Sequence, residues 1–415
     1  MTKRWIAMLL CVCMLAGLAA FAQAEGPVEV VFWNGYTGPD QPVLESIVED
    51  FNASQNEVRI KMEIMPWDTL YQKLMPAMIA GNAPDVIGMS VTRYGEYAMA
   101  GKLEALDGYV EKSAIINPEN MVPGLYNAGK FEGTQYAMPM ACAAMVMYYN
   151  KDMFREAGLD PENPPATMEE LQDAWAKLIK KDENGNVTQY AQAIGVKSTV
   201  AMMPVFMWAH GAEYIKDGKS VLDSPEAVEA MTMVAKAFAD GVSPVGLTGQ
   251  EADNLFSAQK AAIEFNGQWA IAGFRGAGID LGIAEVPAGK GGRKTWGGDT
   301  VLCMTADSKV KEAAWKFMEY FNDVEAQTKW SLGVGFIPSR LDMAENEEIL
   351  TKNPDIAVFI KAANYADIFM SDQPLSGRID EEILVPLYES VTRGTETPEK
   401  ALQKASKQLD ALLAE

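Results

Sequence analysis

Histidine and cysteine are scarce in this chain of 415 residues, which has one histidine, His210, and four cysteines. With a single histidine, Ser-His-Asp or Cys-His catalysis is possible only if His210 is the base. Neither the G-x-S-x-G motif nor the H-E-x-x-H motif occurs. Two of the cysteines lie in the first 24 residues. The other two, Cys142 and Cys303, could pair in an oxidising compartment, but we expect two small buried side chains. The chain is therefore not a disulfide scaffold.

Positive charge is also scarce, with 35 Lys and Arg against 57 Asp and Glu and a net charge of −22. This balance disfavours nucleic acid and anionic membranes as partners. The basic loop 289–294 is not a phosphate-binding P-loop, because Ala284 and Gly291 stand where that motif needs glycine and Ser or Thr. Residues 181–187 lack the order of a calcium loop, so Asn184-Gly185 predicts a tight turn. We expect no cofactor.

Long apolar runs are missing except at the N-terminus. Residues 1–24 have the form of a secretory signal peptide: a basic start at Lys3 and Arg4, an apolar stretch over 5–21, and the cleavage pattern Ala22-Gln23-Ala24. The apolar stretch is shorter than the ~20 residues that a membrane helix needs, which disfavours a permanent anchor. We expect export to the periplasm.

The residues after this peptide alternate between strand and helix patterns. Strands are predicted at 28–33, 58–64 and 85–89, with helical spacing of apolar residues over 43–51 and 70–78 between them. Strand–helix–strand units at this spacing predict a parallel sheet, and ligands bind beyond the carboxyl ends of such strands. The loops 33–37 and 90–93 should therefore lie side by side. The length of the chain predicts two lobes.

The stretch from Gly133 to Leu171 is predicted to pass from one lobe to the other. It starts as an apolar strand, turns polar at Tyr149-Asn150-Lys151-Asp152, and reaches a helix through Thr167-Met168-Glu169-Glu170, which has the T-x-x-E form of a capping box. A buried strand followed at once by helix chemistry is typical of such a crossing.

This stretch resembles a block of the family 1 extracellular solute-binding proteins, the receptors of ABC importers. The shared pattern is G-x-x-Y-A-x-P, then Y-N-K-D-x-F-x-x-A-G-L, then P-x-T-x-x-E-L, with Met168 where the family most often has Trp. Residues 80–86 (AGNAPDV), 97–103 (YAMAGKL), 259–269 and 333–340 are similar to further family blocks. Gln259 stands where a glycine is usual.

The resemblance implies an α/β chain with the type II periplasmic-binding-protein fold, which has two lobes, three crossings and a ligand cleft. The expected boundaries are 25–142 plus 297–336 for the first lobe and 143–296 plus 337–415 for the second. It also implies a monomeric, non-enzymatic receptor that closes on a sugar by hinge rotation and delivers it to ABC permease subunits.

Position in this fold selects the candidate ligand-binding residues. Aromatic residues near glycines at strand ends suit stacking on sugar rings, and polar residues beside them suit hydroxyl groups. The candidates are Trp33, Asn34, Tyr36, Ser90, Thr92, Arg93, Trp208, Trp269, Trp296, Asp299 and Arg378.

Three alternatives remain open from the sequence. The cargo could be a glycerol phosphodiester, a polyamine or an oxyanion, since Arg93 favours an anion and Asp299 opposes one. A secreted carbohydrate-active enzyme needs only two carboxylates, which the chain has in abundance. A sensor or adhesin domain could use the same cleft.

Overall fold

The computed structural model describes residues 26–38, 40–197, 202–343, 346–368, 370, 373 and 375–415. The expected signal peptide, residues 1–24, lies outside the described residues. In the described part, no helix combines the length and the apolar character that crossing a membrane requires.

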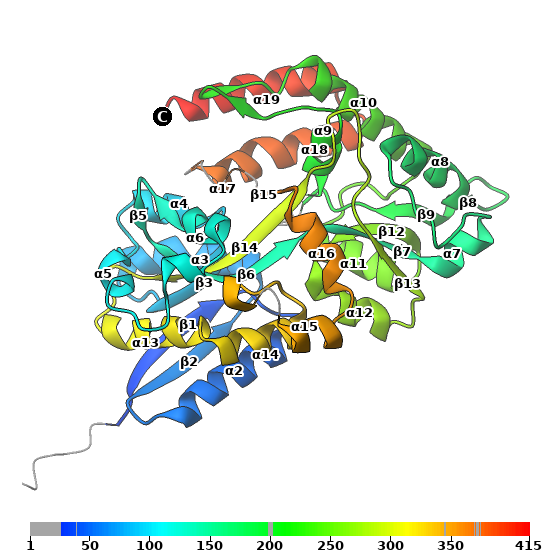
Figure 1. Cartoon of the computed structure of the whole chain (residues 1–415). Helices are drawn as coiled ribbons and strands as arrows, with labels where there is room; N and C mark the ends of the chain where they lie inside the picture. The colour runs from blue at the N-terminus through cyan, green and yellow to red at the C-terminus, as the bar shows by residue number, and fades with distance from the viewer. Residues whose placement is uncertain are drawn as a thin grey trace, which may run out of the picture.

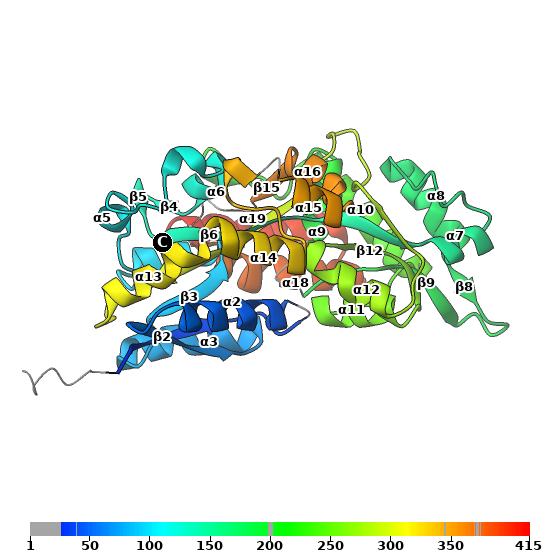
Figure 2. The ribbon, with the colours of Figure 1, turned by 60° about the horizontal axis from the view of Figure 1, so that its bottom comes forward.

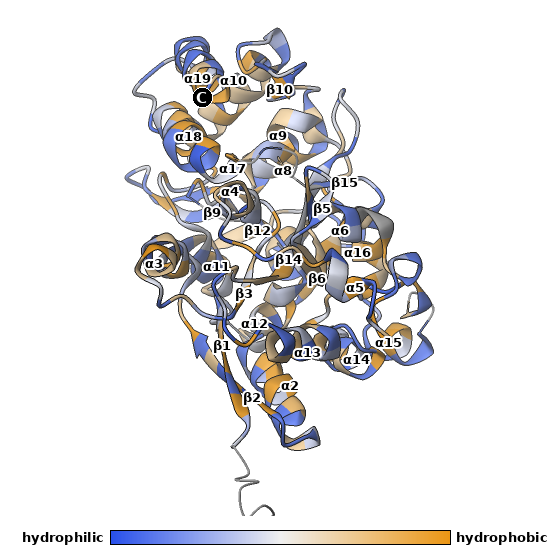
Figure 3. Ribbon diagram, turned by 90° about the vertical axis from the view of Figure 1, so that its left-hand side faces the viewer, coloured by the Kyte–Doolittle hydropathy of each residue, from blue (hydrophilic) through white to orange (hydrophobic). Residues whose placement is uncertain are grey.

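Strand β1 (Val28–Asn34) lies inside the first sheet. It pairs in parallel with β2 (Val58–Ile64) on one side and with β3 (Val86–Ser90) on the other. Helices α2 (Gln41–Ser54) and α3 (Trp67–Ala80) make the two crossovers. Figure 3 shows hydrophilic and hydrophobic residues alternating along β2, whose alternate side chains point to opposite faces. The predicted βαβ units are confirmed.

Strand β14 (Thr295–Met304) completes this sheet from far along the chain. It runs antiparallel to β3 and to β6 (Ala137–Ala144), and its first residues pair in parallel with β15 (Ala366–Ile368). The strand order is β15-β14-β3-β1-β2, with β6 pairing with β14. The chain therefore returns to the first sheet at this strand.

The second sheet has the order β13-β7-β12-β9-β8. Its strands are β7 (Val146–Asn150), β8 (Lys180–Lys181), β9 (Val187–Ala193), β12 (Ala261–Asn266) and β13 (Leu281–Ala284). The chain passes from β6 in the first sheet to β7 in the second through Met145 alone, as Figure 1 shows near its centre. The crossing predicted in the stretch 133–171 is confirmed.

The remaining elements cover the two sheets, and Figure 2 shows α2 and α3 against the first sheet and α11 and α12 beside the second. The shorter strands are β4 (Lys130–Phe131), β5 (Thr134–Gln135), β10 (Ile215–Lys216) and β11 (Lys219–Ser220). The helices after α3 are α4 (Tyr94–Met99), α5 (Asp107–Val110), α6 (Pro123–Ala128), α7 (Lys151–Glu156), α8 (Met168–Leu178), α9 (Met203–Ala209), α10 (Pro225–Asp240), α11 (Gly249–Ser257), α12 (Ile271–Gly276), α13 (Lys311–Phe321), α14 (Val324–Val334), α15 (Glu347–Lys352), α16 (Ile356–Ala363), α17 (Ser376–Arg378), the π-helix Ile379–Leu384, α18 (Val385–Thr392) and α19 (Pro398–Leu413).

One hydrophobic cluster extends through both lobes. In the first lobe it contains Phe32, whose ring centroid lies 5.3 Å from that of Phe317. It continues through Met145 at the crossing to the second lobe, where Trp175 packs beside Phe206 at 6.1 Å. Since all these side chains are buried, the crossing is part of the core and not a loose linker.

The lesser expectations have mixed outcomes. Cys303 is buried as expected, while Cys142 is only half-buried. The register of β6 on β14 places Cys142 opposite Asp299 and Cys303 opposite Ala137. Gly185, with φ 84°, lies in the predicted turn, where Asp182 Oδ1 accepts the N–H groups of Asn184 and Asn186. The two-lobed α/β fold is confirmed, and its exact lobe boundaries stay a prediction.

The predicted capping box at the start of α8 can be tested by mutation. Thr167 Oγ1 accepts the Glu170 N–H at 3.2 Å, and Glu170 Oε2 accepts the Thr167 N–H at 3.1 Å. We expect Thr167→Ala to lower the free energy of unfolding by about 1 kcal/mol, because a helix N–H loses its acceptor. Denaturant titration measures this loss. The control is Thr167→Ser, which keeps the hydroxyl acceptor; a similar loss in that variant would contradict the assignment.

Candidate functional site

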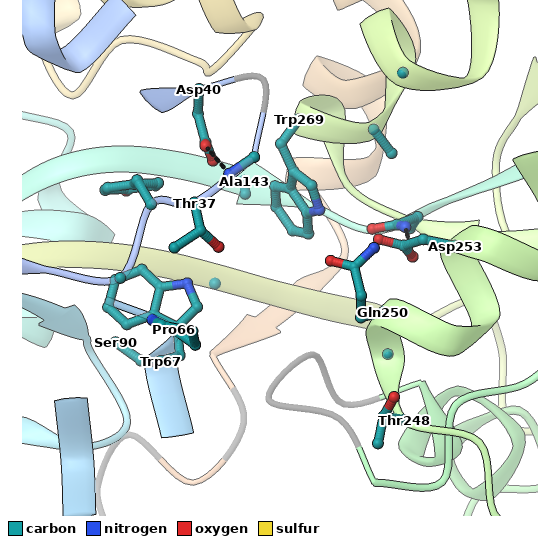
Figure 4. Close-up of a pocket in the computed structure, with 18 of the residues that line it drawn as sticks. Thr37, Asp40, Pro66, Trp67, Ser90, Ala143, Thr248, Gln250, Asp253 and Trp269 are labelled. Carbon is teal, nitrogen blue, oxygen red and sulfur yellow. Dashed lines mark hydrogen bonds between the residues drawn. The ribbon is translucent and has the colours of Figure 1, made fainter. Parts of the chain in front are cut away.

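A cavity of about 650 Å³ lies where the two lobes face each other. One wall comes from loops at the carboxyl ends of β1, β2 and β3, and the facing wall from α11 and the chain around α12. The floor is made by the crossing strands, at Ala143 of β6 and at Trp296, Gly298 and Thr300 of β14. Figure 4 shows Thr37 and Trp67 on one side, with Trp269, Gln250 and Asp253 on the other. Ligand pockets typically measure about 300–1,000 Å³.

Three tryptophans in the lining each pack on a glycine. The pairs are Gly35 with Trp67, Gly267 with Trp269, and Gly298 with Trp296. A Cβ on these glycines would lie 2.0, 2.2 and 1.5 Å from the respective indole ring. Real Cβ atoms do not approach other atoms so closely, so any larger residue would displace the ring. The glycines therefore fix where the indole faces lie.

The aromatic rings contact one another as well as the glycines. Trp269 meets Trp296 edge to face, with ring centroids 6.3 Å apart, and lies 6.0 Å from Phe336. On the other wall, Trp67 lies 5.4 Å from Tyr36 and stacks on Tyr71 at 6.1 Å. Such contacts hold flat apolar surfaces rigid, with Trp67 and Trp269 still half-exposed to the cavity.

The charged groups that line the cavity are Asp40, Asp68, Asp253 and Lys197. Lys197 Nζ lies 2.9 Å from Glu389 Oε1, so its charge is paired. Asp40 is buried, and its Oδ1 accepts the Gly38 N–H at 3.0 Å. Burial raises the pKa of Asp40 to about 6, against the lowering effect of these backbone hydrogen bonds. The wall therefore offers mainly acceptors to a ligand.

Four of the eleven predicted site residues line the cavity: Tyr36, Ser90, Trp269 and Trp296. Ser90 Oγ lies 3.0 Å from Thr92 Oγ1, and the Ser90 N–H donates to Tyr71 Oη at 2.9 Å. Burial raises the pKa of Tyr71 to about 12, while the hydrogen bond from the Ser90 N–H acts in the opposite direction.

Four other predicted residues lie away from the described lining, and the assignment of Asp299 stays a prediction. Trp33 packs on the cluster between the first sheet and α3, and Asn34 is fully buried with Oδ1 accepting the Tyr36 N–H. Trp208 is buried in α9 beneath Lys294 Nζ. Arg378 pairs with Glu382 and Glu415. Asp299 lies in β14, and its side chain is outside what the structure describes.

Thr92 and Arg93 join the lobes in what we call the interlobe clasp, formed with Ser376, Asp380 and Glu381. Ser376 Oγ donates to Thr92 O. Arg93 Nη1 lies 3.0 Å from Glu381 Oε1, and Nη2 lies 4.0 Å from Asp380 Oδ2. These acidic residues continue into α18, which packs on α10 of the second lobe. The charge of Arg93 is thus engaged by protein carboxylates.

Sequence reasoning missed Trp67 and the α11 residues Gln250 and Asp253. Trp67 follows β2, which is parallel to β1 and ends at the same edge of the sheet. The rule that ligands lie beyond strand ends applies to all three strands, so it could have selected Trp67 too. Thr248, which caps α11 with Glu251, was a second usable signal, because it marks a helix that begins at the cleft.

The family model of the bacterial extracellular solute-binding proteins matches residues 46–358, which is more than half of the chain. The chain belongs to this family. The resemblance read from the sequence is therefore confirmed, and the family is one of binding proteins that act outside the cytoplasm.

Two relatives and one solved structure illustrate the similarity of this solute-binding protein. A Brucella abortus (strain 2308) protein described as a binding protein is 28% identical, over 99% of each chain. The maltotriose-binding protein of Pyrococcus abyssi is 28% identical over 85% of this chain and 75% of its own. An ABC-transporter solute-binding protein of Thermotoga lettingae, solved with alpha-D-tagatose, is 23% identical with a TM-score of 0.83, covering 93% of this chain and all of that one.

Replacing a supporting glycine tests the placement of the rings. In Gly298→Ala the new Cβ would overlap Trp296, so we expect an altered near-ultraviolet circular dichroism signal and a loss of about 1–3 kcal/mol of stability. Gly276→Ala is the control, because nothing lies within 4 Å of a Cβ there. An unchanged spectrum in Gly298→Ala would contradict the contact.

The buried carboxyl of Asp40 predicts a pH-dependent stability. Its pKa is raised from 3.8 to about 6 in the folded protein, so ionising it favours unfolding. The free energy of unfolding of the wild type relative to Asp40→Asn should therefore be highest below pH 3.8 and should fall as the pH rises to about 6. The total loss should be about 3 kcal/mol.

Melting curves of the two proteins across this pH range measure the difference. Asp68→Asn serves as control, because Asp68 is exposed on the same rim of the cavity. Parallel curves for wild type and Asp40→Asn would show that Asp40 keeps an ordinary pKa.

Proposed function

We propose that this protein is a periplasmic receptor that captures a carbohydrate between its lobes and delivers it to the permease subunits of an ABC importer. The observation that carries this is the pair of opposed walls bearing Trp67 and Trp269, each indole held on a glycine and half-exposed to the cavity. A pyranose presents apolar C–H faces to such rings and hydroxyl groups around its edge.

Polar side chains at the edges of these rings suit hydroxyl groups. Thr37 and Ser90 come from the first lobe, and Gln250, Asp253 and Asn266 from the second. A hydroxyl left unpaired in a closed site costs about 1–3 kcal/mol, so acceptors and donors on both walls favour a polyhydroxylated ligand. The sugar ligands of the maltotriose-binding relative and of the tagatose-bound structure support the same class.

Charge distinguishes the cargoes left open by the sequence. The lining carries Asp40, Asp68 and Asp253, while its lysine is paired with Glu389 and Arg93 is engaged in the interlobe clasp. An oxyanion or a phosphodiester would face this negative wall without a free cation in the described lining. A neutral sugar fits, and a polyamine is the next candidate, since cations bind to carboxylates and aromatic faces.

We further propose that the protein acts as a monomer and leaves its ligand chemically unchanged. The relatives are binding proteins, which supports a receptor over a glycosidase. An intact sugar recovered after prolonged incubation would support this, and cleaved products would contradict it.

A thermal-shift screen of the mature protein tests the cargo. The panel contains maltotriose, tagatose, spermidine and glycerophosphodiesters. A ligand at 100 times its Kd adds about 2.7 kcal/mol of stability, which gives a clear rise in melting temperature. We expect a sugar to give the largest rise. A larger rise with spermidine or a phosphodiester would overturn the carbohydrate assignment.

Two variants then test the stacking surfaces. Trp67→Ala and Trp269→Ala each remove an indole worth about 2 kcal/mol of apolar contact, so affinity for the bound sugar should fall about 30-fold. Trp208→Phe is the control, because Trp208 lies outside the described lining. Calorimetric titration gives the affinities, and an equal effect of all three variants would argue against stacking on Trp67 and Trp269.

A further inference from the structure

We propose that Glu264 is a neutral carboxyl that donates its proton to Asp253 and so holds the Asp253 carboxylate toward the cavity as an acceptor for a ligand hydroxyl. Glu264 is then a positioning residue, which acts on the ligand through Asp253. The role of Asp253 rests on the proposed function, whereas the shared proton is a property of the ligand-free protein.

The two carboxyl groups come from different elements and differ in exposure. Glu264 lies in β12 and is fully buried, whereas Asp253 lies in α11, is half-buried and lines the cavity. The two carboxyl groups meet at the side-chain amide of Asn266, whose Nδ2 lies within hydrogen-bond distance of an oxygen of each. Figure 4 shows Asp253 beside Gln250 and near Trp269, on the second-lobe wall.

A hydrogen bond between two carboxyl groups requires one proton, because two carboxylates have no donor to share. Burial raises the pKa of Glu264 well above 4.5, and the charge of Asp253 raises it further. Glu264 Oε2 is buried and no described group donates to it, as expected for an oxygen that carries the proton itself. Asp253, nearer to the solvent, is the better site for the charge.

Asn266 fixes the geometry of the pair. Its Nδ2 donates to Asp253 Oδ1 at 2.8 Å and to Glu264 Oε1 at 3.2 Å, while its Oδ1 accepts the Gly267 N–H at 2.8 Å. The amide thus supplies a donor to each acid. With the proton of Glu264, Asp253 has two donors behind it, and its remaining lone pairs are available to a ligand.

The other groups that face Glu264 are few. Tyr148 is directly opposite on β7, and its hydroxyl donates to Gly267 O at 2.7 Å. Ala193 is the neighbour on β9 and has no charge. The charges of Arg275 and Asp355 affect the pKa of Tyr148. The two residues also form an ion pair, with Arg275 Nη2 2.7 Å from Asp355 Oδ2. Burial is therefore the main cause of the raised pKa of Glu264, and Asp253 is the charged group that raises it further.

The ligand-free test compares the wild type with Glu264→Gln and Asp253→Asn. Glutamine keeps a donor toward Asp253 but cannot ionise. Because the pKa of Glu264 is raised on folding, wild-type stability relative to Glu264→Gln should be highest below pH 4.5 and fall as pH rises. In the Asp253→Asn background the neighbouring charge is absent, so Glu264 should ionise at lower pH and this fall should end earlier.

An infrared difference spectrum between wild type and Glu264→Gln at neutral pH reads the proton directly. We expect the C=O stretching band of a protonated carboxyl that the variant lacks. Absence of this band, or melting curves of wild type and Glu264→Gln that stay parallel with pH, would overturn the assignment. A fall that does not change in the Asp253→Asn background would overturn the shared proton.

Titration with maltotriose tests the effect on binding. We expect Glu264→Gln to stay within about threefold of wild type. Asp253→Asn, which replaces the charged acceptor by a neutral amide, and Glu264→Leu, which removes the donor, should each lose about tenfold or more. An equal loss in Glu264→Gln would overturn the positioning role even if Glu264→Leu folds poorly. If maltotriose binds none of the proteins, the carbohydrate assignment is weakened, and the ligand-free profiles still decide the shared proton.

Discussion

The backbone pairing of β14 with β6 is the contact on which the two-lobed arrangement depends. Both strands belong to the first sheet, yet β6 continues through Met145 into β7 of the second sheet, and β14 follows β13 of the second sheet after residues 285–294. Backbone hydrogen bonds in a buried ladder are costly to leave unmade, so the crossing point is fixed in register. Ile337, which lies almost 200 residues further along the chain, adds an antiparallel bridge to Cys142 on the same strand β6. The cavity floor is therefore rigid, and any movement between the lobes must take place around it.

Three glycines determine the shape of the walls above this floor. Glycine at positions 35, 267 and 298 lets an indole lie directly on the backbone, so the ring position is set by sterics and not by a flexible contact. Two of these glycines lie within two residues of the tryptophan that they support, and Gly35 supports Trp67 from the neighbouring strand end. A binding surface built in this way presents flat, preorganised faces without further ordering when a ligand arrives.

Much of the fold could be predicted from the sequence, because its local signals agree. The strand pattern in 58–64 and the capping box at Thr167 lie where the structure has β2 and α8. The residues of the site were harder to predict than the fold. Trp33 and Trp67 both stand near strand ends, but only the packing decides that Trp33 points to the α3 side and that Trp67 faces the cavity. The partners of Arg93 lie almost 290 residues along the chain, beyond the reach of any local pattern.

The interlobe clasp stabilises the observed arrangement of the two lobes through contacts within the protein itself. Contacts of Arg93 and Thr92 with the segment 376–381 form between protein groups, so they favour this arrangement of the lobes whether or not the cavity is filled. Apparent affinity scales with the fraction of molecules already in the binding-competent arrangement. Substitutions at the clasp would therefore change the apparent affinity for the ligand without changing any residue that contacts it.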